Sequence, residues 1–407
     1  MTIRREKAVG GGLGRREFLA AGAAALAFAI VKPQSVRGAE ANSKIEIGLI
    51  GCGGRGGWIA KLFQENGNYK FVAGADYFED KVKTFATKFG VDASRSYTGL
   101  SACKKLAESK LDAVVIESPP YFHPGHAAGA VEAGRHVYLA KPPAVDVPGC
   151  TLVAESGKKA TAKNLVYLID FQTRADPIFR EAVKRVHNGD IGRIVSGEAV
   201  YYCGFTFGNA EFDVKDPEVR LRHWTVDNVL SGDIITEQNV HALDVASWVI
   251  DEAPVRAVGT CGRKAKKGSG DLHDHFAVVF TFPGDVIVSF ASKQYGEGWD
   301  DIGVRMFGPR GTLDAHYFGA VSIKGSVPYA GGTMKNLYTE GAVANIAEFH
   351  NSIVNKKYDN PTVAPSVRSD LTTILGRTAA YKGGPVTWDE MIKANEKLEF
   401  DLKGLKA

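Results

Sequence analysis

A glycine-rich loop, placed between an apolar run and a predicted helix, constrains this chain more than any other feature. Residues 45–50 read IEIGLI, which is typical of a buried parallel strand, and residues 51–56 then read GCGGRG. A second apolar run, residues 70–75, is followed by Asp76, 20 positions after Gly56. Glycines at this spacing permit a tight turn, close approach of a pyrophosphate and close helix packing, while the acid accepts hydrogen bonds from a ribose. The pattern predicts a dinucleotide site at the N-terminus of the helix that begins near Gly56.

Predicted strands and helices alternate through residues 42–170. This alternation is typical of a doubly wound parallel sheet, whose ligands lie beyond the carboxyl ends of the strands. We therefore expect an α/β fold with a dinucleotide-binding domain of the Rossmann type over residues 42–170. The expected strands are 45–50, 70–75, 112–117, 135–139 and 165–169, and the expected helices lie near 56–66, 79–89, 99–109, 124–133 and 148–162.

From residue 171 onward, long strand-like runs replace the alternation. A helix near 175–187 comes first, and few helices are expected between the runs that follow. This pattern predicts, over residues 171–385, an α+β domain with an open, mainly antiparallel sheet that keeps one face free to cover a ligand. A C-terminal segment, residues 386–407, completes the chain. The strand-like runs are 193–203, 255–262, 274–282, 285–292, 302–307 and 312–315.

The N-terminal segment is typical of an export signal. A pair of arginines at residues 15–16 precedes an uncharged, alanine-rich run over residues 18–31, which at 14 residues is too short to span a bilayer as a permanent helix. Residues 39–41 read AEA, a small-residue site for cleavage before Asn42. We expect residues 1–41 to be a twin-arginine signal peptide that exports the folded protein to the periplasm without a stable membrane anchor. A disordered basic N-terminus fits the paired arginines less well.

Charge and cysteine content exclude several classes of function. Residues 1–41 hold seven basic and three acidic residues, which accounts for the whole formal charge of +4. The remainder is near neutral, so we expect neither a nucleic-acid nor a membrane-surface partner. The five cysteines show no C-x-x-C or Cys/His spacing. Residues 273–275 read HDH, but alternation on a strand points Asp274 away from both histidines, and no metal site is expected.

Several ordered motifs resemble the Gfo/Idh/MocA family of oxidoreductases. Besides the glycine loop, they are residues 118–123 (SPPYFH), 134–142 (GRHVYLAKP), 232–244 (GDIITEQNVHALD) and 386–390 (VTWDE). The likeness extends over essentially the whole chain after the signal segment. It implies a nicotinamide dinucleotide cofactor and a sugar or polyol substrate. It also implies a second-domain sheet that often mediates oligomerisation, and because an uncovered apolar face favours a partner, we expect a homodimer or homotetramer.

The chain departs from the family pattern at two positions. Ala140 stands where the family usually has glutamate before Lys-Pro, and Glu237 stands where aspartate is common, four residues before the motif histidine. The missing carboxylate at Ala140 would help to orient the lysine or the nicotinamide. We therefore expect the sheet edge to be kept and the proton relay or the orientation of the cofactor to differ from the family pattern.

Three residues of these motifs have the chemistry that hydride transfer from a carbinol needs, which is a proton acceptor and donors that polarise the developing carbonyl. Lys141 follows a predicted strand, and a lysine desolvated beside the cofactor ring has a lowered pKa. Glu237, His241 and Asp244 are spaced i, i+4 and i+7, one face of a helix expected to begin near Asp233. We expect Lys141, Glu237 and His241 to be catalytic and Asp244 to support them.

Other residues near the expected cleft have a functional and a structural interpretation. His123, after a Ser-Pro-Pro turn, contacts the substrate or the nicotinamide, or is a loop histidine. We expect Arg174 either to donate to a sugar oxygen or to pair with Asp176. Residues 222–224 (RHW) either bind carbohydrate or pack as a loop. The predicted cofactor-binding residues are Gly51, Gly53, Gly54, Arg55, Gly56, Asp76, Ser118, Pro119, His123 and Lys141, and the predicted substrate-binding residues are His123, Arg174, His223, Trp224, Glu237 and His241.

The expected cofactor and the expected export together narrow the chemistry. Asp76 favours NAD because a carboxylate repels the 2′-phosphate of NADP, although the nearby Lys81 leaves NADP possible. Free cofactor is scarce outside the cytoplasm, so an exported enzyme should retain NAD and restore its redox state in every cycle. Oxidoreduction between two sugars meets this condition. So does glycoside hydrolysis through transient oxidation and elimination, with Tyr201, Tyr202 or His223 serving the leaving group. A sugar-binding protein without turnover is the third possibility.

Overall fold

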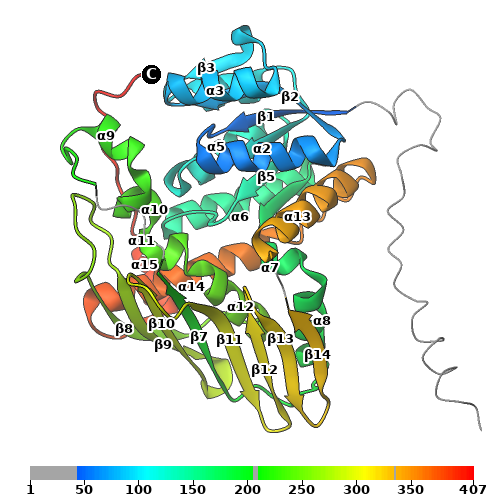
Figure 1. Ribbon diagram of the computed structural model, residues 1–407, viewed down its shortest axis with the longest axis vertical. Coiled ribbons are helices and arrows are strands. Elements are labelled where there is room, and N and C mark those ends of the chain that lie inside the picture. The colour runs from blue at the N-terminus through cyan, green and yellow to red at the C-terminus, as the bar shows by residue number, and fades with distance from the viewer. Residues whose placement is uncertain (1–43, 205–209, 334–335) are drawn as a thin grey trace, which may run out of the picture. The chain divides into compact units, whose positions relative to one another are not determined.

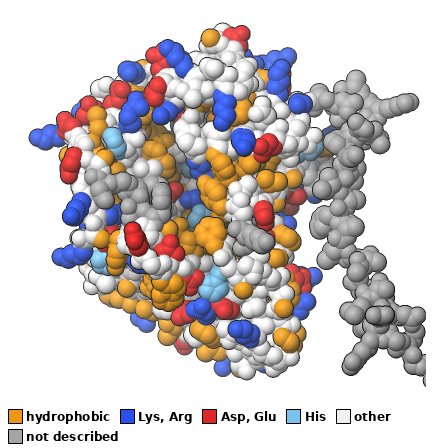
Figure 2. Space-filling model, viewed as in Figure 1, with side chains coloured by type: hydrophobic (Ala, Val, Ile, Leu, Met, Phe, Trp, Pro, Cys, Tyr) orange, Lys and Arg blue, Asp and Glu red, His pale blue; other side chains and the backbone are white. Residues whose placement is uncertain are grey.

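The computed structural model describes residues 44–204, 210–333 and 336–407, and the expected signal segment, residues 1–41, lies outside them. Two sheets and the helices packed on them make up the described residues (Figure 1). Within these residues, no helix is both long and apolar enough to cross a membrane. Charged side chains of both signs are mixed over the face shown in Figure 2, as expected for a chain that is near neutral after its first 41 residues.

The first sheet has six parallel strands in the order β3-β2-β1-β4-β5-β6. The strand order reverses between β1 and β4, which is the switch point where ligands of doubly wound sheets bind. Strands β4 and β5 are buried almost throughout, because helices cover a parallel sheet on both faces. The predicted Rossmann sheet is confirmed. Its strands are β1 (Ile45–Ile50), β2 (Tyr69–Asp76), β3 (Ser96–Thr98), β4 (Ala113–Ile116), β5 (His136–Ala140) and β6 (Tyr167–Asp170).

The helices of this half begin and end where the sequence provides caps. The Asp146 side chain accepts the N–H of Gly149 at 2.8 Å at the start of α6. The helix expected near 99–109 begins only at Ala102, because Gly99 turns the chain with a φ of +86°. The helices are α2 (Gly54–Asn66), α3 (Glu79–Phe89), α4 (Ala102–Glu108), α5 (His123–Glu132) and α6 (Val147–Ala162), with short turns η1 (Ala93–Arg95) and η2 (Pro120–Phe122).

The second sheet has nine strands in the order β14-β13-β12-β11-β7-β10-β9-β8-β15. All neighbours are antiparallel except β7 and β10, so the prediction of an open, mainly antiparallel sheet is confirmed. Strands β13, β14 and β15 were not predicted. The strands are β7 (Ser196–Cys203), β8 (Arg256–Gly262), β9 (His275–Phe282), β10 (Val286–Gln294), β11 (Asp301–Gly308), β12 (Gly311–His316), β13 (Ala320–Gly325), β14 (Tyr329–Thr333) and β15 (Val386–Thr387).

Two long helices that the sequence pattern did not indicate, α13 and α14, complete the cores. Helix α14 packs with α12 against the inner face of the second sheet, whereas α13 packs on the Rossmann half (Figure 1). There the hydroxyl of Tyr69 donates to the carbonyl of Ile346 at 2.9 Å. The helices are α7 (Gln172–Ala175), α8 (Pro177–His187), α9 (Pro217–Arg222), α10 (Asn228–Ser231), α11 (Asp233–Glu237), α12 (Val240–Ile250), α13 (Leu337–Val354), α14 (Val363–Lys382) and α15 (Trp388–Ala394), with turns η3 (Trp224–Val226) and η4 (Pro283–Asp285).

Candidate active site

The glycine loop has the geometry of a dinucleotide-binding turn. Gly51 follows β1 with a φ of +89°, and a Cβ there would lie 2.5 Å from the backbone carbonyl of Glu117. A Cβ at Gly56 would lie 1.8 Å from the carbonyl oxygen of Gly51. Both positions therefore require glycine, the first for the turn and the second for close packing of α2 on the loop.

The N-terminus of α2 opens onto free space. A Cβ built at Gly53 or Gly54 meets no atom within 4 Å, so a side chain would only fill the space in front of the helix N–H groups. Those N–H groups and the helix dipole attract an anion. Beside them, the Asp76 carboxylate accepts the N–H of Cys52 at 2.7 Å and that of Phe78 at 3.0 Å. These residues fit the pyrophosphate and the adenosine ribose of a dinucleotide.

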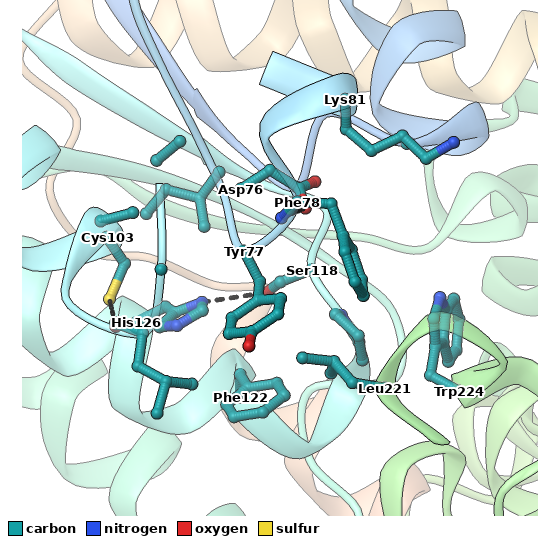
Figure 3. A pocket seen from close by; sticks show the side chains of 18 of the residues that line it. Asp76, Tyr77, Phe78, Lys81, Cys103, Ser118, Phe122, His126, Leu221 and Trp224 are labelled. Carbon is teal, nitrogen blue, oxygen red and sulfur yellow. Dashed lines mark hydrogen bonds between the residues drawn. The ribbon is translucent and has the colours of Figure 1, made fainter. Parts of the chain in front are cut away.

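A cavity of about 430 Å³ adjoins the loop (Figure 3). Its wall is mostly apolar and combines Phe122 of the Rossmann half with Trp224 and Leu402 from later in the chain. Asp76 also lines the cavity, which places it on the adenosine side of the glycine loop. Lys141 is not among the lining residues. The cavity therefore fits the adenosine half of the cofactor, and the reacting groups lie elsewhere.

The turn after β4 places a different histidine on this cavity from the one predicted. The ring nitrogens of His123 lie 2.7 Å from the carbonyl oxygens of Pro142 and Ser118, and the residue is 1% exposed. His123 thus connects two strand-end turns and does not face a ligand, contrary to the prediction. His126 lines the cavity instead, with its Nδ1 2.9 Å from Ser118 Oγ (Figure 3). Burial lowers the pKa of His126 to about 3, so the ring is neutral.

The side chain of Arg55 points toward strand ends rather than toward a phosphate. Its Nε lies 2.8 Å from Glu117 Oε2 and its Nη2 2.9 Å from Asp170 Oδ2, and both carboxylate side chains are fully buried. Arg55 also donates to the hydroxyl of Tyr338. Burial raises the pKa of Glu117 to about 7, while the Arg55 charge opposes the rise. Arg55 therefore connects the cofactor loop to the carboxyl ends of β4 and β6.

Lys141 and Glu237 form a buried pair across the two halves of the described chain. Lys141 follows β5, Glu237 ends α11, and Nζ lies 3.0 Å from Oε1. Nζ also donates to the backbone carbonyl of Glu237. Burial lowers the pKa of Lys141, and the Glu237 carboxylate opposes that change. The pair has the features expected of a proton-transfer group at the carboxyl edge of the cofactor sheet.

The single helix expected to carry Glu237, His241 and Asp244 is interrupted. Helix α11 ends at Glu237 and α12 begins at Val240, so the predicted continuous helix is wrong. His241 is nevertheless buried in the same region, and its pKa is lowered by burial and by the charges of Lys141 and Arg55. The structure therefore brings Lys141, Glu237 and His241 together, although not on one helical face.

Arg174 and Asp244 form an ion pair with each other, so that the guanidinium is not available to a substrate. Nε of Arg174 donates to both carboxylate oxygens of Asp244, at 2.9 and 3.1 Å, and Nη2 donates at 2.8 Å. The guanidinium also lies over the Trp248 ring, 5.1 Å from its centre. Asp176, the alternative partner, caps α8 by accepting the N–H of Ile178 and of the next residue. The predicted contact of Arg174 with a sugar is thus replaced by an internal ion pair, and the predicted supporting role of Asp244 stays a prediction.

The stretch 222–224 belongs to the cofactor cavity rather than to a carbohydrate site. The ring of His223 stacks on Phe212 with centroids 4.4 Å apart, and its Nδ1 lies 3.0 Å from the carbonyl of Val219. Trp224 lines the cavity on the adenosine side. The structure therefore does not support the prediction that His223 and Trp224 bind the sugar.

The histidines of the HDH stretch have separate partners. His273 Nδ1 lies 2.7 Å from Asp233 Oδ2, and His275 Nδ1 lies 2.5 Å from Asp274 Oδ1. Asp274 therefore contacts His275, contrary to the alternation argument, and its other oxygen accepts three backbone N–H groups of residues 264–266. Across residues 44–204, 210–333 and 336–407, no group of three or more potential metal ligands is found.

Several residues of the site escaped sequence reasoning. Glu117 and Asp170 directly follow or end β4 and β6, and the rule that parallel strands present ligands at their carboxyl ends would have found them. His126 lies one helical turn after His123 and could have been weighed with it. Tyr338 comes from α13, which had no recognisable pattern, so no signal pointed to it.

The fold and the site together define a class, the NAD-binding α/β oxidoreductases with a second, mainly antiparallel domain. The chain belongs to the GFO/IDH/MocA family. Residues 45–168 match the oxidoreductase family with an NAD-binding Rossmann fold, and residues 179–314 match the GFO/IDH/MocA C-terminal domain. The Rossmann half is therefore an NAD-binding domain.

Individual relatives are distant but extend over most of the chain. An inositol 2-dehydrogenase of Rhizobium meliloti is 25% identical over 351 residues, 83% of this chain and 96% of that protein. An inositol 2-dehydrogenase of Acidothermus cellulolyticus is 27% identical over 66% of this chain and 72% of that protein. Levoglucosan dehydrogenase in complex with NADH shares the fold, with a TM-score of 0.69 and 18% identity over 85% of this chain and 99% of that one. The structure of a myo-inositol 2-dehydrogenase of Lactobacillus plantarum has a TM-score of 0.66 and 20% identity, over 85% of this chain and 99% of that one.

Proposed function

We propose that this protein is an exported, NAD-dependent oxidoreductase that transfers hydride between a sugar or polyol carbinol and nicotinamide. The observation that carries the proposal is the buried Lys141–Glu237 pair, with His241 beside it, at the carboxyl edge of an NAD-binding sheet. Similarity to proteins named inositol 2-dehydrogenase supports the substrate class. The paired arginines at residues 15–16 support export.

The described residues suit the proton half of this reaction. Bound NAD supplies the hydride acceptor. Lys141 Nζ holds the reacting hydroxyl and relays its proton toward Glu237 Oε1, 3.0 Å away. His241 Nδ1 has no hydrogen-bond partner among the described residues, and a neutral ring can accept from a neighbouring hydroxyl at this atom. The site thus removes the hydroxyl proton as the carbinol carbon loses hydride.

A C-terminal segment borders the adenosine cavity, and we name residues 396–407 the tail strap. It runs from the end of α15 past α9 toward β3 (Figure 1). The N–H of Lys406 donates to the Tyr77 hydroxyl at 3.1 Å, and the carbonyl of Lys406 accepts the N–H of Leu100 at 2.9 Å. Leu402 of the strap lines the cavity. The strap therefore attaches to the Rossmann half directly beside the adenosine site.

These contacts support a cofactor that stays bound. Residues of both halves of the chain border the adenosine cavity, and we expect them to slow the dissociation of a bound adenosine. Export would separate the protein from the cytoplasmic supply of NAD. We therefore infer a cycle that leaves NAD in its starting redox state. Asp76, whose carboxylate borders the cavity, favours NAD over NADP.

Two redox-neutral reactions fit this arrangement, oxidoreduction between two sugars and hydrolysis of a glycoside through transient oxidation. The second needs an acid for the leaving group. Of the three predicted candidates, Tyr201 lies on the inner face of the second sheet, where it is 8% exposed. Tyr202 contacts Trp299 on the opposite face, with tilted rings whose centroids lie 6.0 Å apart, and His223 stacks on Phe212. We therefore keep Tyr201 alone for the glycosidase alternative.

The outer face of the second sheet suits a second copy of the chain. Val258, Val279 and Ile287 are 46, 40 and 49% exposed on neighbouring strands of this face. An exposed apolar face of this kind favours association, and in a closed dimer the same patch meets itself. We propose a homodimer or homotetramer built on this face.

Reduction of the bound cofactor tests the proposed function. Protein comprising residues 42–407 is mixed with a neutral sugar or polyol without added NAD, and absorbance at 340 nm is followed. We expect one bound equivalent of NADH to appear and to disappear on addition of a second, oxidised sugar. A glycosidase would instead release aglycone with no lasting NADH. If neither occurs with NAD present in the protein, the alternative of a binding protein without turnover is favoured.

A further inference from the structure

The inner face of β10 changes from apolar to polar toward its carboxyl end. Side chains alternate along a strand, and the buried, inward positions are Val288, Phe290, Ser292 and Gln294. The first two belong to the hydrophobic core. The last two are polar, yet Ser292 is 4% exposed and Gln294 is 0% exposed. Strand position alone does not require polar residues at these two sites.

Both side chains lack partners within the described protein. Neither the Oε1 nor the Nε2 of Gln294 has a hydrogen-bond partner, nor has the Oγ of Ser292. Buried polar groups in folded proteins are almost always paired, and an unpaired one destabilises the folded chain. Glu237 Oε2 and His241 Nδ1 are unpaired as well. Such groups are expected where a hydrogen-bonding ligand completes the site.

The register of the sheet connects these residues to the proposed reaction site. Ser292 pairs with Tyr201 of β7, and Gln294 pairs with Cys203, two residues further along the same strand. On its other side, Tyr201 pairs with Ile302 of β11, whose carbonyl accepts the N–H of Tyr317 at 2.8 Å. The ring of Tyr317 in turn lies 5.2 Å from that of His241. Tyr201 and Ser292 are therefore connected through Tyr317 to His241, Gln294 lies two residues further along β10, and we name Tyr201, Ser292 and Gln294 the polar floor.

The charges around this floor are already matched. Lys141 pairs with Glu237, and Arg55 pairs with two carboxylates. Nε and Nη2 of Arg174 both donate to the Asp244 carboxylate. The floor itself offers only hydroxyl and amide groups. An anionic substrate would find no cation free of a carboxylate among these residues, whereas an uncharged polyol would satisfy the unpaired atoms.

We propose that Ser292 and Gln294 bind hydroxyl groups of an uncharged polyol, sugar or glycoside and thereby determine the specificity of the site. This inference rests on the proposed function, and it adds the charge of the substrate and the residues that select it. Ser292 Oγ and the Gln294 amide hydrogen-bond the substrate hydroxyls on the sheet side, while Lys141 holds the reacting hydroxyl. Uronates and sugar phosphates are excluded because each nearby cation is already paired with a carboxylate and none is left to pair with their charge.

Two variants separate binding from structure. Ser292→Ala and Gln294→Met remove the unpaired polar atoms and keep side-chain volume nearly constant. A ligand-binding role predicts that Tm of each variant equals or exceeds that of the wild type, since an unpaired buried group has been removed. It also predicts that KM for a neutral substrate rises roughly fivefold per lost hydrogen bond. Ser326→Ala is the matched control, because Ser326 is an exposed serine after β13, away from both the floor and the proposed dimer face.

The substrate panel consists of myo-inositol, D-glucose, D-glucuronate and glucose 6-phosphate. We expect kcat/KM for the neutral compounds to exceed that for the anions about a hundredfold. A wild-type preference for glucuronate, unchanged KM in both variants, or a Tm lowered by several degrees in both would overturn the inference. If the wild type oxidises no neutral compound, the proposed function fails instead. Ligand-induced shifts of Tm with myo-inositol, compared between wild type and variants, then still decide whether the floor binds polyols.

Discussion

The cofactor half and the substrate half of this site are built in opposite ways. Around the glycine loop, one short stretch of sequence provides the turn, and the polar groups are paired, as Asp76 is with two backbone N–H groups. Around Lys141, residues from distant strands and helices meet, and several buried polar atoms have no partner. The first half is complete before any substrate arrives. The second half contains buried polar atoms without hydrogen-bond partners, which lowers the stability of the fold and leaves these atoms able to bind a substrate.

The largest predicted effect concerns the substrate half. Lys141→Ala should lower kcat about a thousandfold, because the proton-transfer group is lost. The content of bound NAD should not change, since Lys141 does not line the adenosine cavity. Single-turnover formation of NADH at 340 nm measures the effect. Lys61→Ala, at an exposed position of α2, is the control. Undiminished turnover in Lys141→Ala would show that another group takes the proton.

The next effect concerns the cofactor half. Deletion of residues 400–407 removes most of the tail strap and should raise the dissociation rate of NAD about tenfold, because the cavity loses Leu402 and the contacts of Lys406 with Tyr77 and Leu100. Leu402→Ala should raise the rate less, since only one lining side chain is shortened. Stopped-flow displacement of bound NADH measures the rate. Circular dichroism establishes that both variants are folded. A dissociation rate equal to that of the wild type in both variants would show that the tail strap does not retain NAD.

The smallest predicted effect concerns a core carboxyl, Asp370, and the dependence of the free energy of unfolding on pH. Burial raises the pKa of Asp370 to about 7, as it does for Glu117. A carboxyl whose pKa is higher in the folded chain stabilises the fold below its ordinary value of about 4, and this contribution is lost as pH rises through about 7. Asp370→Asn should therefore flatten the fall in stability between about pH 5 and 7. Urea unfolding at both pH values tests this, and an unchanged slope would contradict it.

Sequence reasoning succeeded where structure is local. The strands and helices of the Rossmann half, and the glycine positions, follow from apolar runs and from turns that need glycine. The antiparallel sheet was also predicted, because its long strands alternate in burial. Lys141, Glu237 and His241 were predicted to be catalytic from motif resemblance and from the chemistry of their side chains. The structure brings these three residues together.

What the sequence did not reveal depends on tertiary packing. Helix α14 buries Ser366, Asp370 and Thr373 among its core contacts, which obscures its apolar pattern. The break between α11 and α12 leaves no glycine or proline signal, and it is this break that separates Glu237 from the helix of His241. The wrong assignments of His123, Arg174 and His223 share one cause. Each of these polar side chains has a hydrogen-bond partner within the fold.

The substitution at Ala140 also becomes clearer in the structure. Ala140 ends β5 and pairs with Asp170 on one side, while Glu117 follows the strand paired on the other side. Carboxylates therefore flank the position where the family usually has one, and Arg55 bridges the two. Loss of the acid at Ala140 does not leave this edge of the sheet without negative charge.

The central claim is that the chain holds NAD as a permanent part of its active site. The most direct test is the dinucleotide content of the purified protein comprising residues 42–407, measured by denaturation and mass spectrometry of the released small molecules. The account predicts nearly one NAD or NADH per chain, retained through dialysis. A protein that is empty after purification and binds added NAD only weakly would contradict it, and would indicate an ordinary dehydrogenase that exchanges its cofactor.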